Sequence, residues 1–474
     1  MREWGPSVAL GLLAAVLYGA TLCPTVSWYD SAEFSASAAT LRVVPHPPGY
    51  PLYTLIGHVF TWLPGEAAWG MNVMSLVFGV ACVVLMHRVG RALGFGQPAS
   101  VAAAVVLAVA PTLWDNAVKA EVYTPGLAWM LAVVLLCLRA QARDDVRWAW
   151  AAAGVAGVGL GVHMSLATWG LGFVTLLIVG FARGAGPDAP PRARAFWLRL
   201  GLGCTVAVLL GSLVFLLIPF GPFDTVTPLG PYPNTSERMW RRFTADVTGG
   251  VFRKYFKPMP ADVRATRIAG IFVDNLGALP LALAVCGLGW TWVRRRGLLV
   301  ALVLGAVGNV AFFFRYDVPD LDVFLLPAMV SVILLCAAGV EALHRTRRAL
   351  GLVAVAAVIG ASSWTAGQTY ALVDRSNDRS ARAFGEAACA RLEPHAVLAM
   401  TSMPSEWHPY SVLLYMHESG EGCQGAEFWG LANPDMIRQA LAAGRPVYAY
   451  VQRPRFAGHF TLEPDGPLYR VRAP

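Results

Sequence analysis

Charged residues are scarce in this chain. Only 14% of its 474 residues are Asp, Glu, Lys or Arg, whereas a soluble domain has about 25%. Hydrophobic residues make up 56%. This composition excludes an ordinary soluble protein and predicts a polytopic helical membrane protein. The net charge of +8 does not indicate nucleic-acid binding, because the basic residues lie mostly in short segments between hydrophobic runs.

Metal-binding patterns are also lacking. The sequence has no Cys-x-x-Cys and no cluster of histidine and cysteine with ligand spacing, so we predict no metal centre. Six of the eight cysteines lie in or beside apolar segments, where cysteine usually serves as a small packing residue. Cys389 and Cys423 lie in a polar tail and could pair if that tail faces an oxidising compartment.

Long hydrophobic runs dominate the rest of the chain. A helix needs about 20 apolar residues to cross a membrane. Eleven segments approach or reach this length, near residues 5–23, 70–88, 98–113, 123–139, 147–162, 165–182, 199–219, 271–293, 298–314, 323–343 and 349–366. We divide 147–182 at Gly161-Val-His163, because arginine clusters flank it on both sides and the chain must cross twice to keep both clusters cytoplasmic.

Arginine also gives the orientation. Arginine-rich loops alternate along the chain with loops that carry few basic residues, so all the arginine-rich loops fall on one side of the membrane. The positive-inside rule makes that side cytoplasmic, and the N-terminus lies on it. The first helix is expected to remain uncleaved. The extracytoplasmic parts are then loops 24–69, 114–122, 220–270 and 315–322 and the tail from residue 367.

Two carboxylates stand out in the first outer loop. Asp30 and Glu33 begin a predicted helix over 31–43, beside the membrane, where ionisable groups tend to be functional. A purely structural alternative is a capping box, in which both side chains satisfy the first amides of that helix. The proline-rich turn His46-Pro-Pro-Gly-Tyr-Pro51 follows and restricts the backbone.

These motifs have a counterpart in a known family. Thr25-Val-Ser-Trp-Tyr-Asp-Ser-Ala-Glu-Phe34 and His46-Pro-Pro-Gly-Tyr-Pro-Leu52 resemble the opening signature of a bacterial membrane family of unknown function. That family is related to a eukaryotic transmembrane protein O-mannosyltransferase, within the GT-C glycosyltransferase superfamily. The resemblance continues at Ala120-Glu-Val-Tyr-Thr124, Gly161-Val-His163 and Tyr316-Asp-Val-Pro-Asp320. Ala32 stands where the family usually has glycine, and Pro228–Asn234 replaces an expected Asn-Trp-Gly segment, which bears on acceptor preference.

The resemblance implies a reaction and a site. GT-C enzymes transfer a sugar from a polyprenyl-phosphate carrier on the extracytoplasmic side, often without a metal, and no cofactor is expected. By similarity, Asp30 is the catalytic base and Glu33 orients Asp30 or the acceptor. The residues expected to bind substrate lie in the outer loops and at span ends: His46, Tyr50, Glu121, His163, Arg241, Arg242, Arg315, Tyr316, Asp317 and Asp320.

Several of these residues have a second interpretation. The basic residues of loop 220–270 either hold a lipid phosphate or contact anionic head groups. Arg315 either reaches that phosphate or pairs with Asp317 or Asp320. His163 either binds substrate or packs, and Glu121 either joins the site or forms an ion pair with Lys119.

The tail has a different composition from the rest. Residues 1–366 form the predicted GT-C-like membrane domain, and 367–474 alternate predicted helices and strands, as in a small α/β domain. That domain carries no Gly-rich phosphate loop and no nucleophile motif, so it serves either as a stabilising cap or in acceptor recognition.

Together these features predict a multi-pass glycosyltransferase of the bacterial inner membrane. It would move a sugar, mannose by resemblance, to a protein hydroxyl, with membrane lipids, a lipid-linked donor and a protein acceptor as partners. A transporter or flippase is the alternative, but it should carry charges within spans and inverted repeats. A non-catalytic scaffold is the other alternative.

Overall fold

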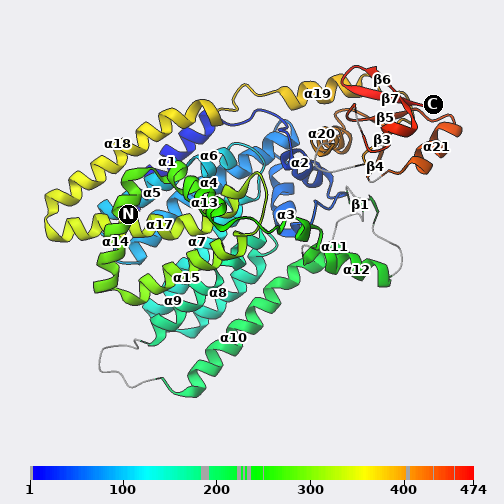
Figure 1. The fold of residues 1–474 in the computed structure, drawn as a ribbon. Helices are drawn as coiled ribbons and strands as arrows, with labels where there is room; N and C mark the ends of the chain where they lie inside the picture. The colour runs from blue at the N-terminus through cyan, green and yellow to red at the C-terminus, as the bar shows by residue number, and fades with distance from the viewer. Residues whose placement is uncertain are drawn as a thin grey trace.

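The fold is a bundle of apolar helices with a small α/β domain at one end (Figure 1). The computed structural model describes residues 4–182, 192–220, 226–227, 230–231, 236–248, 250–401, 406–430, 432–452 and 454–474. In this part of the chain, seven helices are long and apolar enough to cross a membrane: α4 (Ala67–Ala92), α7 (Tyr123–Arg143), η1–α9 (Met164–Ala182), α10–α11 (Arg194–Phe220), α15 (Arg296–Phe313), α17 (Leu326–Thr346) and α18 (Arg348–Val373).

The remaining predicted spans are bent or short. Two helix pairs bend by 63° and 104° and could each form one span: α5 (Gln97–Ala108) with α6 (Pro111–Ala117), and α13 (Ala261–Leu276) with α14 (Ala278–Arg294). Pro111 starts α6 after the first break, and Gly277 makes the second with a φ of +76°. The shorter helices are α1 (Gly5–Ala20) and α8 (Val146–Gly159). Each of the eleven predicted segments is therefore helical, and the predicted break at Gly161-Val-His163 is confirmed.

Close backbone contact holds the centre of the bundle together. α17 is the most buried of the seven long apolar helices, and α14 packs along it. At their crossing, a Cβ on Gly287 would collide with the carbonyl oxygen of Leu335, and one on Gly339 with that of Leu283. Small residues allow such close approach between membrane helices.

The basic loops meet at one end of the bundle. The Arg295 guanidinium donates to the carbonyl of Leu93, and Glu341 accepts from the amide of Gly96 at 2.7 Å. The turns α4–α5 and α14–α15 and the end of α17 are therefore neighbours. Three of the arginine-rich segments therefore lie together, and the orientation of the bundle stays a prediction.

Short elements fill the outer loops at the other end. They are α2 (Asp30–Thr40), α3 (Pro51–Phe60), β1 (Val226–Thr227), β2 (Gly230–Pro231), α12 (Ser236–Val247), η3 (Gly250–Tyr255) and α16 (Leu321–Phe324). α2 ends earlier than predicted, because Leu41 adopts a left-handed conformation with a φ of +58°. α3 is too short to span, as predicted.

The tail forms a mixed five-stranded sheet flanked by helices. Its elements are α19 (Ser380–Cys389), β3 (Val397–Ala399), α20 (Trp407–Glu418), β4 (Glu427–Trp429), α21 (Pro434–Ala442), β5 (Val447–Ala449), η4 (Ala457–His459), β6 (Thr461–Asp465) and β7 (Leu468–Arg472). The strand order is β4-β3-β5-β7-β6, with β4, β3 and β5 parallel. Asn433 caps α21 as its position suggests, and a disulfide joins Cys389 to Cys423.

The α/β domain packs directly on the first outer loop. In Figure 1, α20 lies beside α2. One hydrophobic cluster contains Val26, Ala32 and Ala36 from the loop together with Tyr410 and Leu414 from α20. The domain is therefore part of the surroundings of Asp30 and Glu33.

The α14–α17 contact can be tested with two glycines of α14. Gly287→Ala should lower the free energy of unfolding by about 1–3 kcal/mol, because the added methyl group collides with backbone. Gly289→Ala is the matched control, because a Cβ there meets no atom within 4 Å. Denaturant or thermal unfolding in detergent would compare the variants, and equal stability of the two would contradict the predicted collision.

Candidate active site

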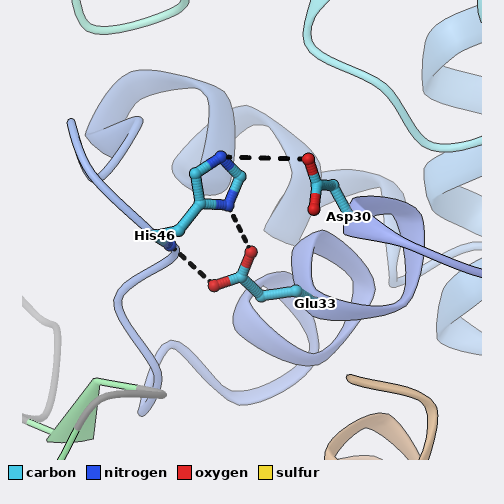
Figure 2. Close-up of side chains that lie close together, drawn as sticks. All are labelled: Asp30, Glu33 and His46. Atoms are coloured by element: carbon cyan, nitrogen blue, oxygen red, sulfur yellow. Dashed lines mark hydrogen bonds and ion pairs between the residues drawn. The ribbon is translucent and has the colours of Figure 1, made fainter. Parts of the chain in front are cut away.

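Two short contacts join Glu33 to His46 in the candidate site (Figure 2). Glu33 lies on α2 with none of its side chain exposed. Its Oε1 accepts from the backbone amide of His46 at 2.6 Å, and its Oε2 lies 2.5 Å from His46 Nδ1. A buried carboxylate needs such partners, since an unpaired buried charge is very costly. The pair therefore fixes the proline-rich loop against α2.

The charge state of the pair follows from its surroundings. Burial lowers the pKa of His46, but the carboxylates of Glu33 and Asp30 outweigh this effect and raise it to about 9. Burial also raises the pKa of Glu33, while His46 opposes that rise. At neutral pH, His46 is thus protonated, and its Nδ1 can donate to Glu33.

Asp30 faces the other nitrogen of the same ring. Its Oδ2 lies 3.9 Å from His46 Nε2, and its Oδ1 accepts from Trp407 Nε1 at 2.8 Å (Figure 2 shows the former). The Asp30 side chain is 39% exposed, so it is open to a ligand. The capping-box alternative is wrong: Tyr29 is the N-cap of α2, and no side chain caps this helix.

Aromatic rings pack around His46 and His163. The Tyr50 hydroxyl lies 3.3 Å from His46 Nε2, and the Tyr50 ring stacks on His163 with centroids 6.0 Å apart. Tyr123 and Phe324 meet the same His163 ring. His163 therefore joins the site through packing, and its Nδ1 bonds to the hydroxyl of Ser165 at 2.5 Å.

Glu121 is a buried acid near this group. Burial raises its pKa to about 8, the nearby Lys119 opposes that rise, and the charges of Asp30 and Asp320 add to it. The expected ion pair with Lys119 is not formed, because Lys119 pairs with Asp115 at 2.5 Å. Glu121 is thus largely protonated at neutral pH and able to donate a hydrogen bond.

Of the residues predicted in loop 315–322, Asp320 and Tyr316 contact the aromatic residues around His163, whereas Asp317 and Arg315 do not. Asp320 lies 3.5 Å from the Tyr123 hydroxyl, and the Tyr316 ring packs edge-on to Phe324. Asp317 does not pair with Arg315, the suggested partner. It faces two arginines of α13, Arg264 and Arg267, each at 3.5 Å. Arg315 is exposed.

The long loop 220–270 reaches the site through an aromatic residue. Phe252 of η3 lies edge-on to His46 at 6.3 Å between ring centroids. Arg241 is exposed on α12, and the side chain of Arg242 lies outside the described residues. The residue of this loop that contacts His46 is thus Phe252, whereas the prediction named basic residues of the loop as ligands of a lipid phosphate.

A metal ion would have to compete with existing bonds. One ligand atom each from Asp30, Glu33 and His46 lie within 4.8 Å of one another. Both Glu33 oxygens and His46 Nδ1, however, already bond to each other. Asp30 Oδ2 and His46 Nε2 lie 3.9 Å apart with no hydrogen bond between them, but the Tyr50 hydroxyl already lies 3.3 Å from Nε2. The positive imidazolium also disfavours a cation there.

Three residues at or near the site were not predicted from sequence: Trp407, Phe252 and Arg264. Arg264 is fully buried, and its Nε and Nη1 have no partner among the described residues. Arg264 and Arg267 both lie on α13, and nothing in the sequence shows which of the two is buried. Trp407 and Phe252 lie far along the chain from the residues they contact and belong to no motif.

The ion pair makes stability depend on pH. His46 has a pKa of about 9 in the folded protein and an ordinary value of 6.5, so the folded state binds this proton more tightly. This contribution is present in full below pH 6.5 and is lost as pH rises through 9. Melting temperatures of the wild type and His46→Gln should therefore differ most near pH 6 and converge by pH 10. A difference that grows with pH would contradict the assigned charge state.

Part of the chain is similar in sequence to known proteins. The profile of the family described as "Protein O-mannosyl-transferase TMEM260 N-terminal domain" matches residues 30–182. Protein O-mannosyl-transferase TMEM260 of Mus musculus is 32% identical over 136 residues, which is 28% of this chain and 19% of that protein. The Dictyostelium discoideum protein of the same description is 26% identical over 133 residues, 27% of this chain and 16% of its own length. The matched segment is thus under a fifth of either relative.

Similarity of fold extends much further. The crystal structure of ArnT from Cupriavidus metallidurans in the apo state matches 99% of this chain and 98% of its own, with a TM-score of 0.64 and 14% identity. ArnT bound to undecaprenyl phosphate matches 98% of this chain and 97% of its own, with a TM-score of 0.62 and 14% identity. The chain therefore has the GT-C fold of ArnT over nearly its whole length, and its residues 30–182 match the N-terminal domain of the TMEM260 protein O-mannosyl-transferase family.

Proposed function

We propose that this protein is a membrane glycosyltransferase that moves a sugar from a polyprenyl phosphate to a protein hydroxyl on the extracytoplasmic side. The observation that carries the proposal is the half-exposed Asp30 carboxylate, held beside the His46 imidazolium at the outer end of an ArnT-like bundle. Mannose as the sugar and a protein as the acceptor follow the names of the relatives that match residues 30–182. The bacterial inner membrane is the expected location.

Asp30 would act as the general base. A sugar transfer with inversion needs one group to remove the proton from the attacking hydroxyl, and a positioned carboxylate suits this step. Glu33 cannot take this role while both its oxygens bond to His46. Its role would instead be to hold His46, so that the imidazolium lies 3.9 Å from Asp30.

The charge that develops on the leaving phosphate also needs stabilisation. The His46 imidazolium is the positive group nearest the reacting carboxylate, and the protonated Glu121 could donate a hydrogen bond. The exposed Arg241 and Arg315 remain candidates for the lipid phosphate, as ArnT bound to undecaprenyl phosphate suggests for a donor of this kind. The disulfide between Cys389 and Cys423 supports an extracytoplasmic position for the α/β domain.

The catalytic assignment predicts unequal effects of two substitutions. Asp30→Asn should lower kcat by about 10²- to 10⁴-fold, because the base is lost. Glu33→Gln should lower it less, because His46 keeps part of its support. Asp435→Asn is the control, since Asp435 lies on the exposed surface of α21 and pairs only with Arg438 among the described residues.

Transfer would be measured with purified protein, labelled polyprenyl-phosphate mannose and cell-envelope protein. Full transfer by both Asp30→Asn and Glu33→Gln would reject the assignment. Movement of the lipid-linked sugar across vesicles without any transfer would favour the flippase alternative.

We also propose that the reaction needs no metal, because the only group of three potential ligands found in the described residues is already internally bonded. Prolonged treatment with EDTA should therefore leave the transfer rate unchanged. Loss of activity that Mn²⁺ or Mg²⁺ restores would contradict this expectation and indicate a cation between Asp30 and His46.

A further inference from the structure

The contact between Trp407 and Asp30 joins the α/β domain to the proposed base. Trp407 is the first residue of α20 and is 4% exposed. Its indole Nε1 donates to Asp30 Oδ1 at 2.8 Å, while the opposite carboxylate oxygen faces His46. The Trp407 ring also stands edge-on to the His46 ring, with centroids 6.3 Å apart. One side chain of the tail thus touches both members of the proposed acid–imidazolium pair.

We propose that Trp407 is a positioning residue that holds the Asp30 carboxylate in the orientation needed to accept the acceptor proton. This inference rests on the proposed function. The Asp30 side chain is 39% exposed, and a partly exposed side chain can change rotamer unless a partner holds it. The indole fixes Oδ1 and leaves Oδ2 directed toward His46 and the open side of the site.

The rest of α20 supports this geometry. Three further residues of the same helix bond to the first outer loop or the start of α4. Ser411 donates to the carbonyl of Tyr29 at 3.0 Å, the Tyr415 hydroxyl accepts from the amide of Ala68 at 3.3 Å, and Glu418 accepts from Thr40 at 3.0 Å. With Trp407 they recur at helical spacing, so one face of α20 lies along α2.

The start of α20 is itself anchored inside the tail. Glu406 is fully buried and accepts from both the amide and the hydroxyl of Thr401, at 2.6 and 2.7 Å. Thr401 lies two residues after the end of β3 and also accepts from the amide of Arg455. The Trp407 ring then stacks on Tyr410 within the domain core. The indole is therefore held from behind, and its N–H projects toward Asp30 as a fixed donor.

Trp407→Phe tests the donor while keeping a ring in place. We expect kcat to fall about tenfold with little change in KM for the donor, as loss of one hydrogen bond to a charged group would give. Trp28→Phe is the matched control. Trp28 also crosses the interface through its indole, but to the hydroxyl of Ser380 at 2.8 Å and not to an acid.

The comparison of kcat and KM separates positioning from simple packing. kcat should fall in Trp407→Phe and stay unchanged in Trp28→Phe, because only the first removes a donor to the carboxylate. Equal kcat in the two variants would overturn the proposal, and so would an effect of Trp407→Phe on KM alone.

A spectroscopic measurement tests the contact between Trp407 and Asp30 without requiring sugar transfer. In the protein labelled with 5-fluorotryptophan, Asp30→Ala should shift the ¹⁹F resonance of Trp407 and leave that of Trp28 in place. An unshifted Trp407 resonance would overturn the proposal even if Trp407→Phe fails to fold. If the wild-type protein transfers no sugar, the proposed function fails, and the resonance still decides whether Trp407 holds Asp30.

Discussion

A carboxylate without exposed surface must find its hydrogen bonds inside the protein, and Glu33 finds them in His46. This single pairing determines much of the outer surface. It ties the loop after α2 back onto that helix, sets the ring of His46 beside Asp30, and brings Tyr50 to the start of α3. The Glu33 side chain that holds the loop also raises the pKa of His46, together with Asp30, so the same pairing favours the charged imidazole.

The candidate site is made by segments that are remote in sequence. α2 supplies Asp30 and Glu33, the end of α6 leads to Glu121, the break before η1 supplies His163, and η3 adds Phe252. The membrane helices hold these segments by close packing, as at Gly287 and Gly339, and carry little polar chemistry near the site themselves. The bundle therefore supports the candidate site, whose polar groups lie in the segments that join its helices.

Much of the fold could be predicted from sequence, because long apolar segments and alternating arginines leave few alternatives. Asp30, Glu33 and His46 could be identified since they lie within one short motif. The Trp407–Asp30 contact could not, because it joins residues 377 positions apart and an isolated tryptophan has no pattern. Two features have a usable signal in the sequence. Asp115 precedes Lys119 by one helical turn, and Gly466-Pro467, with glycine in the first position, suits the two-residue loop of the β6–β7 hairpin.

The interface between α2 and α20 also sets an order of events in biosynthesis. α2 leaves the ribosome near the beginning of the chain and α20 near the end, with nearly all the membrane helices between them. During most of synthesis, Asp30 thus lacks its indole donor. The two halves of the proposed site can meet only after the last of these helices and the α/β domain have been made and folded. The proposed site is therefore incomplete in a partly made chain, without need of an inhibitor.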